Sequence, residues 1–185
     1  MTKAEARQAV RTALRSAVFP SPEAVCARVC ALPVFNEAAD ILAYYPLKGE
    51  IDVTGLMDRA LDEGRRVWLP VCMPQRKMEF RQVSGPQWRQ SLLRAQDGTL
   101  CPAEGSAVFD PLNPEELTLV IVPGLAFRPD GSRLGRGGGY YDVFLKSISG
   151  KREISTLALC LSCQHDVDFP CEAHDCRVDR ILVLR

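Results

Sequence analysis

Residues 41–71 read ILAYYPLKGEIDVTGLMDRALDEGRRVWLPV and hold the clearest secondary-structure pattern in the chain. Ile41 to Tyr45 is an apolar run of strand length, and Val67 to Val71 is another. Between them, apolar residues recur at helical spacing after Asp52, which suits an N-cap. Gly64 stands where a left-handed residue would end the helix. Strand, helix and strand joined by short links predict an α/β sheet.

The remaining predicted helices lie toward the two ends of the chain. We expect an amphipathic helix from Lys3 to Val18, because its apolar residues recur every three or four positions. A second helix is expected from Pro22 to Cys30, since proline suits a first helical turn, and Pro33 would end it. Tyr140 to Lys146 is expected to be helical as well.

Four further segments have the length and apolar content of strands. These are Met78 to Val83, Leu117 to Val122, Ile154 to Leu161 and Ile181 to Leu184. The first alternates apolar and polar residues, as a strand with one solvent-facing side does. The second is continuously apolar, which suits a central strand covered on both faces. Residues 84–114 are the least regular, and one helical turn is expected there, around Trp88 to Ala95.

Together these elements predict one architecture. The expected fold is a three-layer α/β/α arrangement around a central, mixed and mostly parallel sheet. A chain of 185 residues can form one domain that buries roughly 70% of the surface exposed by the unfolded chain. A second full domain would not fit, so we expect residues 1–185 to form a single domain.

Composition narrows the range of functions. The chain has 23 Lys and Arg residues and 23 Asp and Glu residues, so its formal net charge is zero. No overall field exists to hold a nucleic acid or a membrane surface, and any anion site must be local. Without a signal-peptide pattern or a spanning apolar run, we expect a cytoplasmic monomer, with a dimer as the alternative. The 8 cysteines are expected to be reduced thiols.

The run Arg133-Leu-Gly-Arg-Gly-Gly-Gly-Tyr-Tyr-Asp142 is the most informative stretch for function. Glycines let successive backbone N–H groups point at one place without an intervening Cβ, and a following helix adds its positive end. Arg133 and Arg136 add charged donors. The run lacks the lysine of a Walker A motif, and Tyr140 replaces the last glycine of a dinucleotide fingerprint. It predicts a phosphate-binding loop, with a flexible surface turn as the alternative.

This loop and its surroundings resemble a known family. Val122-Pro-Gly-Leu-Ala-Phe127, Gly131 and the Arg133–Asp142 run are similar to the signature of 5-formyltetrahydrofolate cyclo-ligases, also called 5,10-methenyltetrahydrofolate synthetases. The similarity extends to the helix with Lys3 and Arg7, to Tyr45 through Asp52, to Met78 through Arg81 and to Asp175 through Asp179. It therefore covers most of the chain, although Arg128 stands where the family usually carries Asp.

The resemblance implies an enzyme that uses ATP and Mg²⁺ to convert 5-formyltetrahydrofolate to 5,10-methenyltetrahydrofolate, with release of ADP and phosphate. A formamide oxygen is a poor leaving group. Transfer of the γ-phosphoryl group to that oxygen would create an imine-like centre that N10 of the folate can attack. Such a transfer depends on positioning and charge neutralisation more than on covalent help from the protein.

The resemblance also implies site residues. ATP is expected to contact Lys3, Arg7, Arg133, Leu134, Gly135, Arg136, Gly137, Gly138, Gly139, Tyr140 and Tyr141. The folate is expected to contact Tyr45, Glu50, Tyr140 and Tyr141, and Mg²⁺ is expected at Asp142 and Asp175. Arg136 and Tyr141 are expected to be catalytic.

The basic residues of the N-terminal helix support a nearby anion independently of the family. Lys3, Arg7, Arg11 and Arg15 form a stripe of like charge at i,i+4 spacing, which is mildly destabilising unless something negative faces it. A solvated basic face is the alternative. Asp142 could meet a magnesium ion at the phosphates, or it could act only as a charge at a helix N-terminus.

The residues expected at the folate also have the required chemistry. A carboxylate such as Glu50 can accept hydrogen bonds from the amino and ring N–H groups of a pterin, and a tyrosine can stack on its face. An ordinary loop charge is the alternative for Glu50. Core packing is the alternative for each tyrosine.

A competing constellation lies toward the C-terminus. Its members are Cys160, Cys163, Cys171, His174 and Cys176, and such spacing can hold zinc. It would suit a non-catalytic zinc- or nucleotide-binding regulatory module. Cys160 lies in a predicted strand, where residues three apart point to opposite faces, so it would not converge with Cys163 without a turn. The cyclo-ligase is the leading hypothesis, and the module is the alternative.

Overall fold

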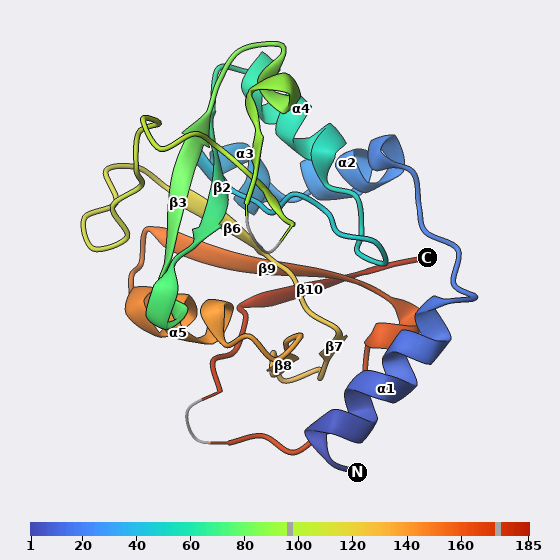
Figure 1. The fold of residues 1–185 in the computed structure, drawn as a ribbon. Coiled ribbons are helices and arrows are strands. Elements are labelled where there is room, and N and C mark those ends of the chain that lie inside the picture. The colour runs from blue at the N-terminus through green and yellow to red at the C-terminus, as the bar shows by residue number, and fades with distance from the viewer. Residues whose placement is uncertain (96–97, 173–174) are drawn as a thin grey trace.

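A computed structural model describes residues 1–95, 98–172 and 175–185 of the chain, and a six-stranded sheet forms its centre (Figure 1). The strands follow the order β10-β9-β6-β1-β2-β3. Their bounds are Asp40–Leu42 (β1), Arg66–Cys72 (β2), Met78–Val83 (β3), Thr118–Val122 (β6), Ile154–Leu161 (β9) and Arg180–Leu184 (β10). Every neighbouring pair is parallel except β2 and β3, so the sheet is mixed and mostly parallel, as predicted.

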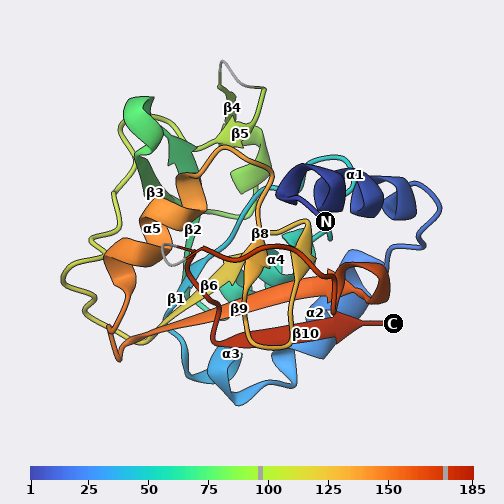
Figure 2. The same ribbon diagram turned by 90° about the horizontal axis from the view of Figure 1, so that it is seen from below.

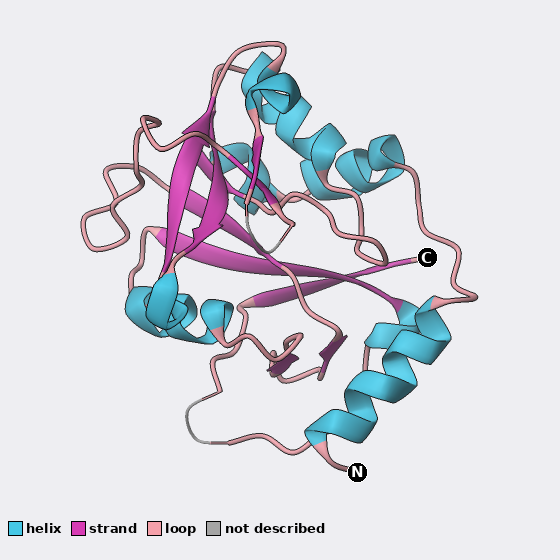
Figure 3. Ribbon diagram, in the orientation of Figure 1, coloured by secondary structure: helices cyan, strands magenta, loops and turns pink. Residues whose placement is uncertain are grey.

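Helices cover both faces of this sheet (Figures 1 and 3). The helices are Lys3–Leu14 (α1), Pro22–Cys30 (α2), Pro33–Glu37 (α3), Thr54–Asp62 (α4) and Tyr140–Ile148 (α5). Buried side chains of α1 to α4 join one hydrophobic cluster, and those of α5 join the other. Along β6, Leu119 and Ile121 belong to the first cluster while Val120 and Val122 belong to the second. The three-layer prediction is therefore confirmed.

Two small hairpins were not predicted from the sequence. One pairs Leu93–Arg94 (β4) with Leu100–Cys101 (β5), at the upper edge of Figure 2, and the other pairs Ala126–Phe127 (β7) with Arg133–Leu134 (β8). Strands of two residues are too short to show a period-2 pattern. Among the described residues, short 3₁₀ turns lie at Pro74–Arg76 (η1), Trp88–Ser91 (η2) and Ser162–Gln164 (η3). The second of these is the helical turn expected around Trp88.

The first predicted helix was too long at its C-terminal end. It ends at Leu14 rather than Val18, and Val18 is 90% exposed, so burial of Val18 does not favour a longer helix. The predicted strand from Ile41 to Tyr45 was also too long. Ala43 still donates its N–H to Trp68, but Pro46 has no N–H to continue the ladder. The chain therefore leaves the sheet beyond β1.

Two proline and capping predictions need small corrections. Pro33 does not simply end a helix, because it occupies the first turn of α3 after α2 has ended at Cys30. The N-cap of α4 is Val53 rather than Asp52. The Asp52 carboxylate nevertheless accepts hydrogen bonds from Thr54 N at 2.9 Å and Thr54 Oγ1 at 2.7 Å. It therefore provides an acceptor for the first backbone N–H of the helix. None of the helices in the described ranges has the length and apolar content needed to cross a bilayer.

Candidate functional site

A cavity of about 250 Å³ lies where three parallel strands end. Its walls include Tyr44 and Tyr45 beyond β1, Cys72 at the end of β2, and Pro123 and Gly124 beyond β6. The strand β1 pairs with β2 on one side and with β6 on the other. The strands that follow β1 in sequence are therefore added first on one side of it and later on the other, so the strand order reverses here. Ligands of open α/β sheets bind outside the carboxyl ends of strands at such a point. The glycine loop lines the same cavity.

The glycine loop has the backbone geometry of an anion site. Gly137 has a φ of +112° and Gly139 a φ of +77°, a region that favours glycine, and Gly139 is the N-cap of α5. Within the described residues, the N–H groups from Arg136 to Tyr141 donate to no acceptor. Unpaired N–H groups and the positive end of the α5 dipole favour a negative group in front of the loop.

Arg136 contacts a residue that was predicted for a different ligand. Its Nε donates to Glu50 Oε1 over 2.8 Å, and Glu50 Oε2 accepts from the Leu47 N–H at 2.9 Å. The Glu50 side chain is 12% exposed, so this ion pair is partly shielded from water. The structure thus joins one residue expected at ATP to one expected at the folate.

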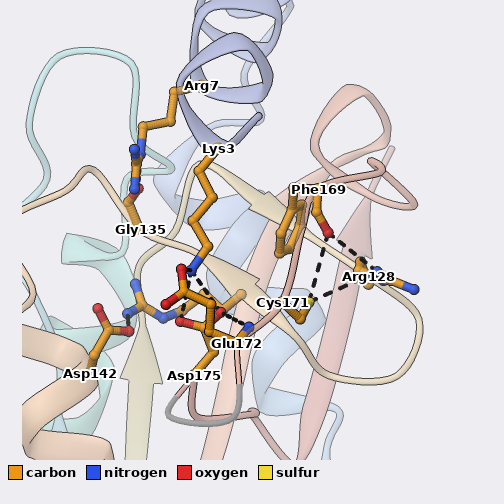
Figure 4. A network of polar contacts seen from close by, with 10 residues as sticks. Lys3, Arg7, Arg128, Gly135, Asp142, Phe169, Cys171, Glu172 and Asp175 are labelled. Atoms are coloured by element: carbon orange, nitrogen blue, oxygen red, sulfur yellow. Dashed lines mark hydrogen bonds and ion pairs between the residues drawn. The ribbon is translucent and has the colours of Figure 1, made fainter. Parts of the chain in front are cut away.

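The two N-terminal members of the basic stripe reach toward the site from α1 (Figure 4). Arg7 Nε donates to the Gly135 carbonyl oxygen over 2.9 Å, which ties the helix to the start of the loop. Lys3 Nζ lies 2.8 Å from Asp175 and 2.9 Å from Glu172. Burial would lower the pKa of Lys3, but hydrogen bonds to these two carboxylates outweigh it and raise the pKa. Farther along the helix, Arg11 and Arg15 are exposed.

Arg133 lies beneath the loop. Its side chain is 4% exposed, with Nη1 donating to the Pro123 carbonyl oxygen at 3.1 Å and Nη2 to Asp142 Oδ1. Its buried Nε has no acceptor among the described residues. A Cβ at Gly135 would lie 2.8 Å from Arg133 Nη1, so a larger residue here would displace the Arg133 guanidinium. Arg133 therefore supports the loop from below and holds Asp142 at the start of α5.

The two aspartates expected at Mg²⁺ are each paired with a cation. Asp142 contacts Arg133, and Asp175 contacts Lys3. Their segments meet, because the Cys176 thiol donates to the Asp142 carbonyl oxygen at 3.7 Å. In the described part of the chain, no three His, Cys, Asp or Glu side chains form a group that could hold a metal.

The cysteines of the competing zinc constellation have separate surroundings. Cys160 is buried in β9 and Cys171 is exposed, while His174 lies outside the described residues. Burial raises the pKa of the Cys160 thiol to about 12, which disfavours the thiolate that zinc requires. All the cysteines are free thiols.

The hydroxyl of Tyr141 is buried and has no hydrogen-bond partner among the described residues. Burial, with a smaller contribution from Glu50, raises the pKa of Tyr141 far above its ordinary value. Tyr141 is therefore neutral at physiological pH and presents an unused O–H donor in the cavity wall. Leaving a buried polar group unpaired costs free energy, so this hydroxyl is available to a ligand or water in the cavity.

The other tyrosines also lie at the cavity. Tyr45 and Tyr140 line it, and Tyr45 also packs edge-on against Trp88 with ring centroids 6.2 Å apart. Tyr44 was not predicted, although it lines the cavity beside Tyr45 and donates its hydroxyl to the Ile51 carbonyl oxygen at 3.1 Å. Met78 was missed too, because only the pairing of β2 with β3 brings it to this edge.

Comparison with known proteins gives a consistent picture. A model of the 5-formyltetrahydrofolate cyclo-ligase family matches residues 2–184. A Mus musculus protein named 5-formyltetrahydrofolate cyclo-ligase is 27% identical over 158 residues, which span 84% of this chain and 78% of that protein. A protein of the same name from Haemophilus influenzae is 31% identical over 151 residues, covering 80% of this chain and 77% of its own. The solved structure of Aquifex aeolicus 5,10-methenyltetrahydrofolate synthetase has a TM-score of 0.76 and 29% identity, covering 99% of this chain and 90% of that one.

Proposed function

The chain belongs to the 5-formyltetrahydrofolate cyclo-ligase family, and we propose how its glycine loop and cavity carry out the ATP-dependent conversion of 5-formyltetrahydrofolate to 5,10-methenyltetrahydrofolate. The protein is an enzyme of this family, a ligase of folate and one-carbon metabolism. The observation that carries the proposal is the row of unpaired N–H groups from Arg136 to Tyr141, which borders a cavity with Glu50 in its wall.

The triphosphate of ATP would lie against the glycine loop. The N–H groups from Arg136 to Tyr141 supply donors that no acceptor in residues 1–95, 98–172 or 175–185 occupies, and the α5 N-terminus favours negative charge. Arg136 is 39% exposed and can turn from Glu50 toward a phosphate oxygen. Arg7 would keep the start of the loop in place through its bond to Gly135.

The pterin end of the folate would occupy the cavity beside Glu50. The Glu50 carboxylate would accept hydrogen bonds from pterin N–H groups once Arg136 engages phosphate. Tyr45 and Tyr140 line the same space and offer aromatic faces for stacking. This arrangement would place the N5 formyl group next to the loop that holds the γ-phosphate, which is the positioning that phosphoryl transfer requires.

The proposed reaction has two steps. First, the formyl oxygen attacks the γ-phosphorus, the bond from that phosphorus to the ADP oxygen breaks, and ADP leaves. Next, the N10 lone pair attacks the formyl carbon and the carbon–oxygen bond breaks, so that phosphate departs with the former formyl oxygen and takes up the proton that N10 loses. Arg136 and the loop N–H groups would neutralise charge on the transferring phosphoryl group.

Tyr141 would act as a hydrogen-bond donor rather than as a base. Its raised pKa keeps the phenol protonated, and its hydroxyl has no acceptor in the described structure. We assign it to an oxygen of the reacting formyl–phosphoryl group, where negative charge changes during the transfer. A neutral donor held in a dry site needs no reorganisation when that charge develops.

Magnesium is implied by the family resemblance, and the donor set fits it. Mg²⁺ keeps several waters and is bound by one or two carboxylates together with phosphate oxygens. Asp142 and Asp175 would supply these carboxylates after exchanging their contacts with Arg133 and Lys3. A bound ion would neutralise charge on the phosphates.

The product assay tests the proposal directly. Purified protein is incubated with 5-formyltetrahydrofolate, ATP and Mg²⁺, and the absorbance of the methenyl product is followed. We expect a rise that requires both substrates and disappears when Mg²⁺ is removed with a chelator. No rise from a folded sample, judged by a cooperative thermal transition, would refute the assigned reaction.

A further inference from the structure

Arg76 brings a fourth guanidinium to the glycine loop from a distant part of the chain. It lies in the turn between β2 and β3, whereas the loop precedes α5. A Cβ placed on Gly139 would lie 3.3 Å from Arg76 Cδ, 3.6 Å from its Nη1 and 3.7 Å from its Nε. The Arg76 side chain thus extends along the residue that caps α5, where the unpaired N–H groups are.

The guanidinium of Arg76 differs from the other three at this loop because it contacts no acceptor among the residues that the structure describes. Arg7 donates to Gly135, Arg133 to Pro123 and Asp142, and Arg136 to Glu50. Arg76 is exposed and makes no hydrogen bond or ion pair with any described residue. Its donors are therefore available to a ligand at the end of the loop opposite Arg7.

The backbone of the β2–β3 turn holds Arg76 in an unusual conformation. Gln75 has a φ of +61° and Arg76 a φ of +60°, and the Lys77 N–H donates to the Pro74 carbonyl oxygen at 3.3 Å. Positive φ at both central residues is typical of hairpin turns that favour Asn and Gly. Neither Gln nor Arg relieves this strain. The conformation persists because the pairing of Cys72 with Met78 fixes the hairpin, and it supports a role for the side chain.

We propose that Arg76 is an additional phosphate-binding residue of the nucleotide site, an inference that rests on the proposed function. The Arg76 guanidinium and the N–H groups beside Gly139 would hold the same polyphosphate, with the arginine opposite the amides. A planar guanidinium suits bidentate contact with phosphate oxygens. Arg76 would then bind the anion of ATP and make no contact with the folate.

The test compares two substitutions in one turn. Arg76→Gln should raise the KM for ATP roughly tenfold, which corresponds to about 1.4 kcal/mol, and leave the KM for 5-formyltetrahydrofolate unchanged. Lys77→Gln removes the same charge from the next residue and should leave both constants unchanged. Arg76→Lys should recover part of the loss, because it restores the charge without the planar fork. If Arg76→Gln and Lys77→Gln change the KM for ATP equally, Arg76 acts only as a surface charge, and the proposal is overturned.

Two further measurements separate this proposal from the proposed function. Inorganic tripolyphosphate binding, followed by calorimetry, needs no turnover and should weaken in Arg76→Gln but not in Lys77→Gln. If Arg136→Ala raises the KM for ATP while Arg76→Gln does not, phosphate binding by Arg76 is refuted, and the proposed function is unaffected. If Arg76→Gln unfolds, Arg76→Gly removes the guanidinium and relieves the positive φ; unchanged tripolyphosphate binding by that variant would also refute the site.

Discussion

Arg136 Nε donates to Glu50 Oε1 over 2.8 Å, and this ion pair joins the loop proposed for ATP to the carboxylate proposed for the pterin. The two residues are 86 positions apart in the chain. The Arg136 guanidinium would have to bind phosphate, and the Glu50 carboxylate would have to bind the pterin, but in this structure the two groups bind each other. We therefore expect the energetics of the two binding events to be coupled, because a ligand at either residue releases the other.

A double-mutant cycle measures this coupling. Arg136→Ala should raise the KM for ATP roughly 10- to 100-fold, since hydrogen bonds to charged groups contribute about 1.5–3 kcal/mol. Glu50→Gln should raise mainly the KM for the folate. The double variant should depart from additivity by roughly 0.5–3 kcal/mol in kcat/KM, as contacting residues do. Additive effects, or equal loss of both ligands in Arg136→Ala, would contradict separate roles linked by the pair.

Arg7 and Arg11 provide a matched comparison on α1. Arg7 donates to the Gly135 carbonyl oxygen, whereas Arg11, one turn farther along, is exposed. Arg7→Ala should loosen the start of the loop and raise the KM for ATP roughly tenfold, as expected for loss of a charged hydrogen bond of about 1.5 kcal/mol. Arg11→Ala should change the KM by less than about twofold. Similar KM values for the two variants would show that the stripe acts only through its overall charge.

Tyr141→Phe should separate activity from stability. The substitution removes a buried hydroxyl that has no partner in the described part of the chain, so the free energy of unfolding should stay constant or rise by about 1 kcal/mol. The kcat should fall on the order of 100-fold, because removing one hydrogen-bond donor to a developing negative charge has an effect of this size in other enzymes. Thermal melts and initial rates measure the two effects. Tyr44→Phe is the control, because it loses the bond to Ile51 and should be destabilised by about 1 kcal/mol. A Tyr141→Phe variant with full kcat would remove Tyr141 from the mechanism.

Alkaline pH should destabilise the fold through buried acids that resist ionisation. Burial raises the pKa of Cys160 from 9.0 to about 12, and burial raises the pKa of Tyr141 and Tyr44 well above 10.0. Above these ordinary values the unfolded chain loses protons that the folded chain retains. Stability is then fully present below pH 9 and falls as pH rises beyond it. Urea unfolding at pH 8 to 11 should show this decline, and Cys160→Ala should make its first part shallower. A midpoint independent of pH over this range would contradict the raised pKa values.

The periodic elements could be predicted from sequence because their signals are local. The helical spacing after Asp52 and the apolar runs of β2, β6 and β9 each depend on residues that are neighbours along the chain. The residues at which helices and strands end could be predicted less well. The ends of α1 and β1 depend on whether the next side chain finds a core to enter, and Val18 and Tyr45 do not continue their elements.

The candidate site was predictable where its residues are consecutive. The glycine loop carries its own signal, since φ values such as those of Gly137 and Gly139 are accessible to glycine without strain. The burial of Arg133, which was expected from the sequence to contact ATP, was not predictable in this way. Its burial beneath the loop follows from contacts with Pro123 and Asp142, which the sequence separates.

The sequence by itself determined the alternation of strands and helices, the glycine run before the last helix and the family to which the chain belongs. These features depend on residue type and on spacing over a few positions. Only the tertiary structure decided that Arg136 faces Glu50, that the Tyr141 hydroxyl is buried and that Arg76 reaches Gly139. Such contacts join segments through sheet order and hairpin register, and no local pattern specifies which distant side chain will lie across a cavity.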